Sequence, residues 1–139
     1  MLAMKCLFCS IVRKEISAEI VYEDDYAVAF LDIHPHAPGH TMVIPRIHAE
    51  NIIELPSDGI GPLFRAVQST VRKIQEALAP SGFTIGINHG KVSGQAVEHL
   101  HIHIMPRFPG DGGGSVHGAV MNPPKEDLKI VGERIRKGR

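Results

Sequence analysis

Three histidines occupy alternate positions in the run Glu-His-Leu-His-Ile-His-Ile-Met-Pro, which spans residues 98–106. Alternation is the period of a β-strand, so His99, His101 and His103 are expected on one face and their aliphatic neighbours on the other. Imidazole is the side chain whose unperturbed pKa lies nearest physiological pH. The run therefore predicts a site for phosphate chemistry, proton transfer or metal binding.

Two thiols form a second reactive group at the start of the chain, where Cys6 and Cys9 make a Cys-x-x-Cys pair. The first residues lack a basic segment followed by a long apolar stretch, so we expect no secretory signal and a cytoplasmic location. A structural disulfide is not expected in that compartment. A redox pair, half of a metal site and two unrelated thiols all remain open from the spacing alone.

The bulk composition is that of an ordinary globular chain, with 139 residues, 43% hydrophobic and 22% charged. This length predicts one domain over 1–139 with a sizeable core. The formal net charge is zero, which argues against a general nucleic-acid binder or a protein of the membrane surface. No apolar run approaches the roughly 18 residues of a membrane span.

The elements that position these side chains follow from the hydrophobic pattern. β-branched and aromatic residues predict five strands, at 19–22, 27–32, 40–45, 83–88 and 97–106. Apolar steps of three and four residues predict a long helix over 60–79, a second over 125–137 and a short helical turn within 6–14. The order predicts an α+β domain with a mainly antiparallel sheet.

The run from Gly94 to Arg107 resembles the signature of the histidine triad (HIT) nucleotide-binding hydrolases, in which three histidines alternate with apolar residues. Segments 30–40, 43–48 and 86–90 resemble further parts of that family. The resemblance covers 6–107 and leaves 108–139 as a C-terminal extension. It implies the HIT-like fold, a five-stranded antiparallel sheet with one long helix and short helices at both ends, paired into a homodimer.

The resemblance implies a hydrolase of purine, AMP-like nucleotides that cleaves at the α-phosphate through a nucleotidyl-His101 intermediate. A neutral imidazole is a good nucleophile near neutral pH, and His103 is placed to donate to a phosphate oxygen. Nucleoside phosphoramidates are the first substrate class and dinucleoside polyphosphates the alternative. A nucleotide-binding protein with vestigial catalysis is a further alternative.

Substrate-binding residues are expected around these histidines. Asp32 is a candidate for the ribose diol, with a loop cap as the alternative role. Asn88 and Gln95 offer amide donors, and His40 is a pocket candidate by its place in the matching segment. The walls of a base pocket, or alternatively plain core, are Phe8, Ile11, Phe30 and Ile33. The histidines expected in solvated loops are His34, His36, His89 and His117.

Some members of the family hold a zinc ion, and the resemblance carries its ligands to Cys6, Cys9, His48 and His99. Two thiolates and two imidazoles form a closed tetrahedral set, so this zinc is expected to be structural. A redox role for the cysteines is the alternative, and it would leave the two histidines unexplained. One metal on all three triad histidines is disfavoured, because the outer two would stand about 13 Å apart along a strand.

The chain departs from the family pattern at Ala96, where many members carry a serine or threonine hydroxyl near the leaving group. A phosphoramidate nitrogen needs a proton in order to depart. The missing hydroxyl therefore puts leaving-group protonation in doubt.

Overall fold

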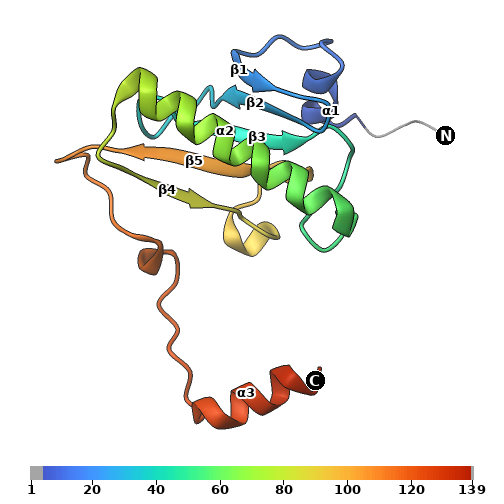
Figure 1. Cartoon of the computed structure of the whole chain (residues 1–139). Coiled ribbons are helices and arrows are strands. Elements are labelled where there is room, and N and C mark those ends of the chain that lie inside the picture. Colours follow the sequence, from blue (N-terminus) through green and yellow to red (C-terminus); the bar gives the residue numbers. More distant parts are fainter. Residues whose placement is uncertain (1–4, 139) are drawn as a thin grey trace.

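The computed structural model describes residues 5–138 and confirms the predicted α+β architecture. A five-stranded antiparallel sheet lies at its centre, in the order β1-β2-β3-β5-β4 (Figure 1). The strands are β1 Ile20–Glu23, β2 Ala27–Leu31, β3 Thr41–Pro45, β4 Gly82–Gly86 and β5 Ile102–Arg107. Within the described part of the chain, no helix is long and apolar enough to cross a membrane.

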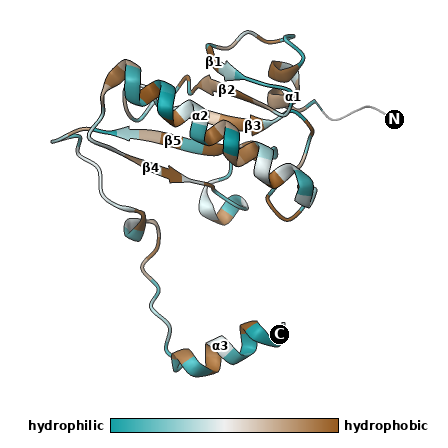
Figure 2. Ribbon diagram, viewed as in Figure 1, coloured by the Kyte–Doolittle hydropathy of each residue, from teal (hydrophilic) through white to brown (hydrophobic). Residues whose placement is uncertain are grey.

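The long helix α2, Ile60–Leu78, covers one face of the sheet (Figure 1). Hydrophobic and hydrophilic residues alternate along it, as an amphipathic helix requires (Figure 2). Its buried residues, three or four positions apart, are Leu63, Ala66, Val67, Thr70 and Ile74. The helix ends one residue before its predicted end because Ala79 adopts a left-handed conformation (φ 48°) ahead of Pro80.

The other face of the sheet is covered over only part of its width. The short helix α1, Leu7–Val12, packs Phe8 and Ile11 against β2 and β3. On β5, by contrast, His103 and Met105 alternate with buried residues and stay partly exposed. Gly86 of β4 lies opposite His103 and adds no side chain. The uncovered half of this face forms a floor on which a ligand can lie.

The strand that carries the histidines begins later than their alternation predicts. The expected strand over 97–106 is wrong in its first part, and of the three histidines only His103 lies in β5. Leu100 donates its N–H to the loop carbonyl of Ala49 at 2.7 Å instead of to a neighbouring strand. The rings of His101 and His103 have centroids 5.0 Å apart, whereas alternate residues of a strand are spaced roughly 7 Å apart along the backbone.

The C-terminal residues leave the sheet as an arm that ends in helix α3, Leu128–Arg136 (Figure 1). This helix begins three residues after its predicted start at 125, because the Asp127 carboxylate accepts the N–H of Lys129 at 3.2 Å and caps it. Its side chains Leu128 and Ile135 are 76% and 73% exposed. A nine-residue helix is marginal without tertiary packing, so this apolar stripe needs a covering surface.

Candidate active site

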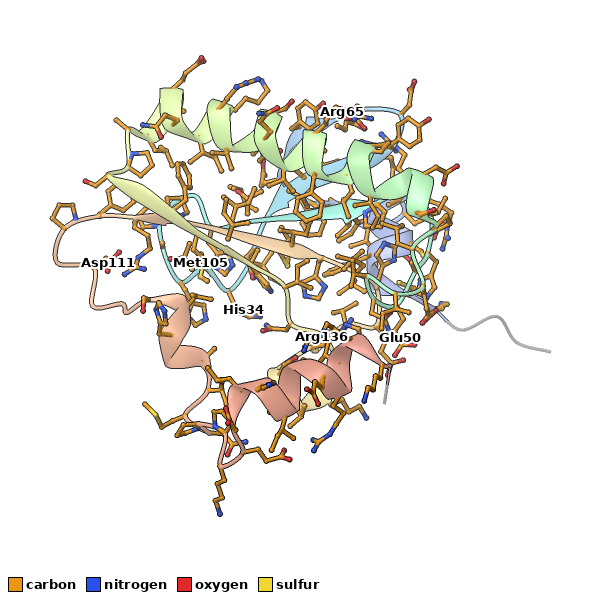
Figure 3. The ribbon with its side chains drawn as sticks, turned by 60° about the horizontal axis from the view of Figure 1, so that its bottom comes forward. His34, Glu50, Arg65, Met105, Asp111 and Arg136 are labelled. Carbon is orange, nitrogen blue, oxygen red and sulfur yellow. The ribbon has the colours of Figure 1, made fainter. Side chains whose placement is uncertain are left out.

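A cavity of about 520 Å³ opens on the uncovered half of the sheet. Figure 3 brings the bottom of the molecule in Figure 1 forward and labels His34, one of the residues that line this cavity. The cavity brings together every residue predicted to bind or act on substrate except Gln95. These residues are Phe8, Ile11, Phe30, Asp32, Ile33, His40, Asn88, His101 and His103.

One end of the cavity is apolar and is formed by α1 against β2. The Phe8 ring packs edge-on against Phe30 with centroids 5.4 Å apart, and Ile11 is buried in the same cluster. Ile33 is 84% exposed, so it stands at the rim and the alternative that it belongs to the core is wrong. An aromatic-walled apolar end suits a planar heterocycle.

His101 lies in the cavity wall with only 6% of its surface exposed. Its Nδ1 is 2.8 Å from the carbonyl oxygen of His99. A carbonyl only accepts, so in neutral His101 the proton sits on Nδ1 and Nε2 keeps its lone pair. Phe8 packs edge-on against the ring at 5.1 Å between centroids. The structure therefore holds His101 in the tautomer in which imidazole is nucleophilic at Nε2.

His103 and His40 are joined ring to ring, with 2.9 Å between His40 Nε2 and His103 Nδ1. The main-chain N–H of His36 donates to His40 Nδ1 at 3.1 Å. A neutral His40 must then carry its proton on Nε2 and donate it to His103 Nδ1. His103 carries its own proton on Nε2, where it is a hydrogen-bond donor.

Both rings are neutral at physiological pH. Burial lowers the pKa of His103 to about 4, and the neighbouring His101 and His40 act in the same direction. Burial also lowers the pKa of His40, against the opposing effect of the Asp32 carboxylate. The two rings therefore form a directed pair of neutral donors and do not act as cations.

Asp32 caps the loop that follows β2 and also lines the cavity. Its Oδ1 accepts the N–H of His34 at 2.9 Å, which is the loop-cap role. Its Oδ2 lies 3.6 Å from His40 Nε2, beyond ordinary hydrogen-bond distance. The cap is thus present while the second carboxylate oxygen sits beside the paired rings.

Asp32, His40 and His103 bring three potential metal-ligand atoms within 4.8 Å of one another. The hydrogen bonds argue against a metal there. Coordination through His40 Nε2 would move the ring proton to Nδ1, where it would meet the N–H of His36, donor against donor. We call these three side chains the relay cluster.

Cys6, Cys9, His48 and His99 also place four ligand atoms within 4.8 Å, and we call them the Cys–His cluster. His99 Nε2 is 2.9 Å from the carbonyl oxygen of Pro45, so the proton sits there and Nδ1 is free to coordinate. That Nδ1 lies 3.4 and 3.5 Å from the two sulfur atoms, and His48 Nδ1 lies 3.4 Å from Cys9 Sγ. Two sulfur and two nitrogen donors match the set that holds structural zinc.

The Cys–His cluster adjoins the cavity through α1. The Sγ of Cys6 accepts the N–H of Cys9 at 3.4 Å and caps this helix. Phe8 stands between the two cysteines in sequence and makes edge-on ring contacts with both His99, at 5.9 Å, and His101. A metal bound at the cluster would therefore hold one wall of the cavity in place.

Gln95 is placed differently from the other predicted binding residues. Its amide oxygen accepts the N–H of Gly90 at 2.8 Å, and its amide nitrogen donates to the carbonyls of Glu50 and Val97 at 2.8 and 3.1 Å. These hydrogen bonds fix the conformation of the loop over 90–97. Gln95 does not itself line the cavity.

The histidines predicted in solvated loops are exposed, as expected: His34, His36, His89 and His117. Sequence reasoning missed the main chain of His36, which directs the tautomer of His40. No side-chain pattern reports a main-chain donor, so that role had no signal in the sequence.

A family model described as the HIT domain matches residues 13–110, which is most of the chain. The chain belongs to the HIT family. The matched part of this HIT protein includes His48 and the three alternating histidines, but neither Cys6 nor Cys9. It also ends before the C-terminal arm, so the arrangement of these outer segments comes from the structure.

Solved structures and a curated relative extend the comparison over nearly the whole chain. A HIT family protein of Bacillus anthracis superposes with a TM-score of 0.85 at 32% identity, covering 99% of both chains. A Zn-bound histidine triad family protein of Mycobacterium smegmatis gives a TM-score of 0.72 at 32% identity, covering 95% of this chain and 91% of that one. Adenosine 5'-monophosphoramidase hnt1 of Schizosaccharomyces pombe is 33% identical, covering 95% of this chain and 96% of the relative.

Proposed function

We propose that this HIT protein hydrolyses purine nucleotide conjugates at the α-phosphate, with nucleoside phosphoramidates as the first substrate class. The observation that carries the proposal is the opposed pair of tautomers in one cavity. His101 presents an unprotonated Nε2, and His103 presents an Nε2–H. The first suits attack on phosphorus and the second suits a phosphate oxygen. The activity in the name of the Schizosaccharomyces pombe relative supports this substrate class.

The proposed reaction has two displacements at phosphorus. His101 Nε2 uses its lone pair to form a P–N bond. The bond from phosphorus to the leaving group breaks, and the leaving group departs with the electron pair and takes a proton from water. The carbonyl of His99 accepts from Nδ1–H and so stabilises the positive charge on the nucleotidyl-imidazole. Water then attacks phosphorus and loses a proton, the P–N bond breaks, and the nucleoside monophosphate leaves.

The cavity supports a matching position for each part of an AMP-like ligand. The base would lie between Phe8, Phe30 and the neighbouring Ile11 and Ile33, and the ribose diol would donate to Asp32. The α-phosphate would then lie between His101, which attacks phosphorus, and His103, which donates to a phosphate oxygen, with the amide of Asn88 beside it. We assign Gln95 the supporting role of holding the loop over 90–97.

The deciding experiment combines turnover with intact mass. Purified protein is mixed with an adenosine phosphoramidate and with diadenosine polyphosphate, and the quenched protein is weighed for an added nucleotidyl group. We expect faster turnover of the phosphoramidate and a trapped adduct that maps to His101. His101→Ala should lower kcat/KM by about 10⁴-fold or more, whereas His89→Ala, a matched change at an exposed histidine, should not.

Other outcomes of that experiment would replace the proposal. Faster turnover of the polyphosphate would favour the dinucleoside polyphosphate alternative. Tight binding of AMP without turnover or adduct would favour vestigial catalysis, for which Ala96 is the feature in the chain. Equal activity of His101→Ala and the unmodified protein would remove the nucleotidyl-histidine step altogether.

We propose further that the Cys–His cluster holds one structural Zn²⁺. The donor set supports this, as does the free Nδ1 of His99 beside both sulfur atoms. The Zn-bound neighbour from Mycobacterium smegmatis has the same fold. With all four positions taken by protein ligands, the metal would stabilise α1 and take no part in the displacement.

We propose a homodimer in the cytoplasm, where thiols remain reduced and able to bind metal. Support for pairing comes from the arm, whose helix α3 lies away from the sheet (Figure 1). Its Leu128 and Ile135 are exposed. The alignment with the Bacillus anthracis chain covers 99% of both chains and thus reaches into the arm. Nucleic acid and membrane are not expected as partners, since the chain carries no net charge.

A further inference from the structure

The loop between β2 and β3 reaches the paired rings through a main-chain group. The N–H of His36 donates to His40 Nδ1 at 3.1 Å, although the His36 side chain is itself exposed. We propose that this amide is a positioning group that locks His40, and through it His103, in single tautomers. The lock fixes which atom of His103 offers a proton to the cavity.

The lock works by elimination at each nitrogen. The His36 amide only donates, so His40 Nδ1 must accept and the one ring proton of neutral His40 is on Nε2. That proton points to His103 Nδ1 at 2.9 Å, which must accept in turn. His103 keeps its proton on Nε2, and its ring needs no tautomer change when negative charge builds up beside it.

Burial makes the lock effective, because it removes the alternatives. His40 is 4% exposed, so water does not compete for its ring nitrogens. The lowered pKa values of His40 and His103 keep both rings neutral, and a neutral ring has one proton to place. A doubly protonated His40 would face the His36 amide with a second donor.

Asp32 adds a coupling between the two ends of the ligand, and this step rests on the proposed function. Its Oδ2 lies 3.6 Å from His40 Nε2, beyond hydrogen-bond distance, and would compete for the locked proton if the carboxylate moved closer. A ribose diol that donates to this carboxylate would occupy the competitor and leave the proton to His103. Ribose binding would thereby strengthen the donor at the phosphate.

Tautomers are read directly by long-range ¹H–¹⁵N correlation of the imidazole rings in the full-length protein near pH 7. We expect unprotonated Nδ1 and protonated Nε2 in both His40 and His103 of the free protein. A protonated Nδ1 on His40 would overturn the lock. This measurement needs no substrate, so it stands or falls independently of hydrolysis.

His36→Pro removes the amide hydrogen, and His36→Ala, the matched control, keeps it while removing the ring. The proline variant should show mixed tautomers in His40 and a loss of kcat of about fivefold, the worth of one hydrogen bond, while the alanine variant keeps the single tautomers. Unchanged tautomers in a folded proline variant would contradict the proposal. If the proline variant does not fold, His40→Gln and His40→Leu replace it.

Glutamine can accept from the His36 amide through oxygen and donate to His103 through nitrogen, whereas leucine can do neither. We expect His40→Leu to lower kcat by about 10²-fold and His40→Gln to recover most of that loss. Equal losses in both variants would contradict the lock.

A 2',3'-dideoxy substrate tests the coupling to ribose. The coupling predicts a lower kcat in addition to a higher KM, and a change in KM alone would leave Asp32 a binding residue without coupling. If the tautomers are as described and no nucleotide is turned over, the proposed function fails and the lock remains.

Discussion

Two groups of side chains adjoin the same cavity wall, and their ligand atoms are equally close. The Cys–His cluster and the relay cluster each bring histidine nitrogens and other donors within 4.8 Å of one another. They differ in what the main chain offers their rings. The carbonyl of Pro45 accepts from His99 and frees a lone pair toward the sulfur atoms, whereas the amide of His36 donates to His40 and turns a proton inward.

The comparison shows that proximity alone does not identify a metal site. When a main-chain carbonyl accepts from one ring nitrogen, the other nitrogen keeps its lone pair and can bind a metal. When a main-chain N–H donates to one ring nitrogen, the other nitrogen carries the proton and can donate a hydrogen bond. His101 lies between the clusters in sequence and shares the first arrangement, because the carbonyl of His99 accepts from its Nδ1. In the proposed reaction this freed lone pair attacks phosphorus.

The largest expected effect is on the zinc content of variants in the two clusters. If the Cys–His cluster holds zinc as proposed, Cys9→Ser should lose it and lower the free energy of unfolding by about 3–5 kcal/mol, or Tm by roughly 10 °C. His40→Gln should retain the zinc. Metal analysis and thermal melts with and without chelator check both. Two zinc ions per chain, or full zinc in Cys9→Ser, would contradict the prediction that the Cys–His cluster binds a metal and the relay cluster does not.

A second prediction concerns pH and the relay cluster. The pKa of His103 is lowered to about 4 in the folded protein, while an unfolded histidine titrates near 6.5. Between these values the unfolded state binds more protons, so the stability contribution is fully present above pH 6.5 and is lost as the pH falls toward 4. The loss should be on the order of 2–3 kcal/mol.

Urea unfolding of the zinc-loaded protein at several pH values between 7.5 and 4.5 measures this slope. His103→Gln should make the slope shallower, and His117→Gln, at an exposed site in the arm, should leave it unchanged. An unaltered slope in His103→Gln would show that His103 titrates in the folded protein as it does in a peptide.

The smallest expected effect lies at Ala96, which lines the cavity that contains His101 and also the neighbouring cavity beside the Cys–His cluster. Ala96→Thr places a hydroxyl near the leaving group, and the isosteric Ala96→Val does not. Threonine should raise kcat for phosphoramidates about fivefold, the worth of one hydrogen bond, with little change for polyphosphates. Equal kcat values for threonine and valine on phosphoramidates would remove leaving-group protonation as the role of this position.

Much of the fold follows from local pattern. The apolar steps of α2 and the β-branched runs of β2 and β3 identify these elements to within one or two residues. The start of β5 could not be predicted this way, because the alternation of the histidines continues through residues 99–101 while their backbone bonds to a loop. The alternation also could not show how close the rings lie, because it fixes the backbone spacing and not the orientation of the side chains.

The sequence by itself determined which side chains carry the chemistry, since imidazoles, thiols and a carboxylate must be encoded at their positions. Nine of the ten residues that it predicts to bind or act on substrate line one cavity, and Gln95 does not. Only the tertiary structure decided what each imidazole can do. The position of its proton depends on main-chain groups of Pro45, His36 and His99. Every residue has such main-chain groups, and only the fold brings these three within hydrogen-bond distance of a ring.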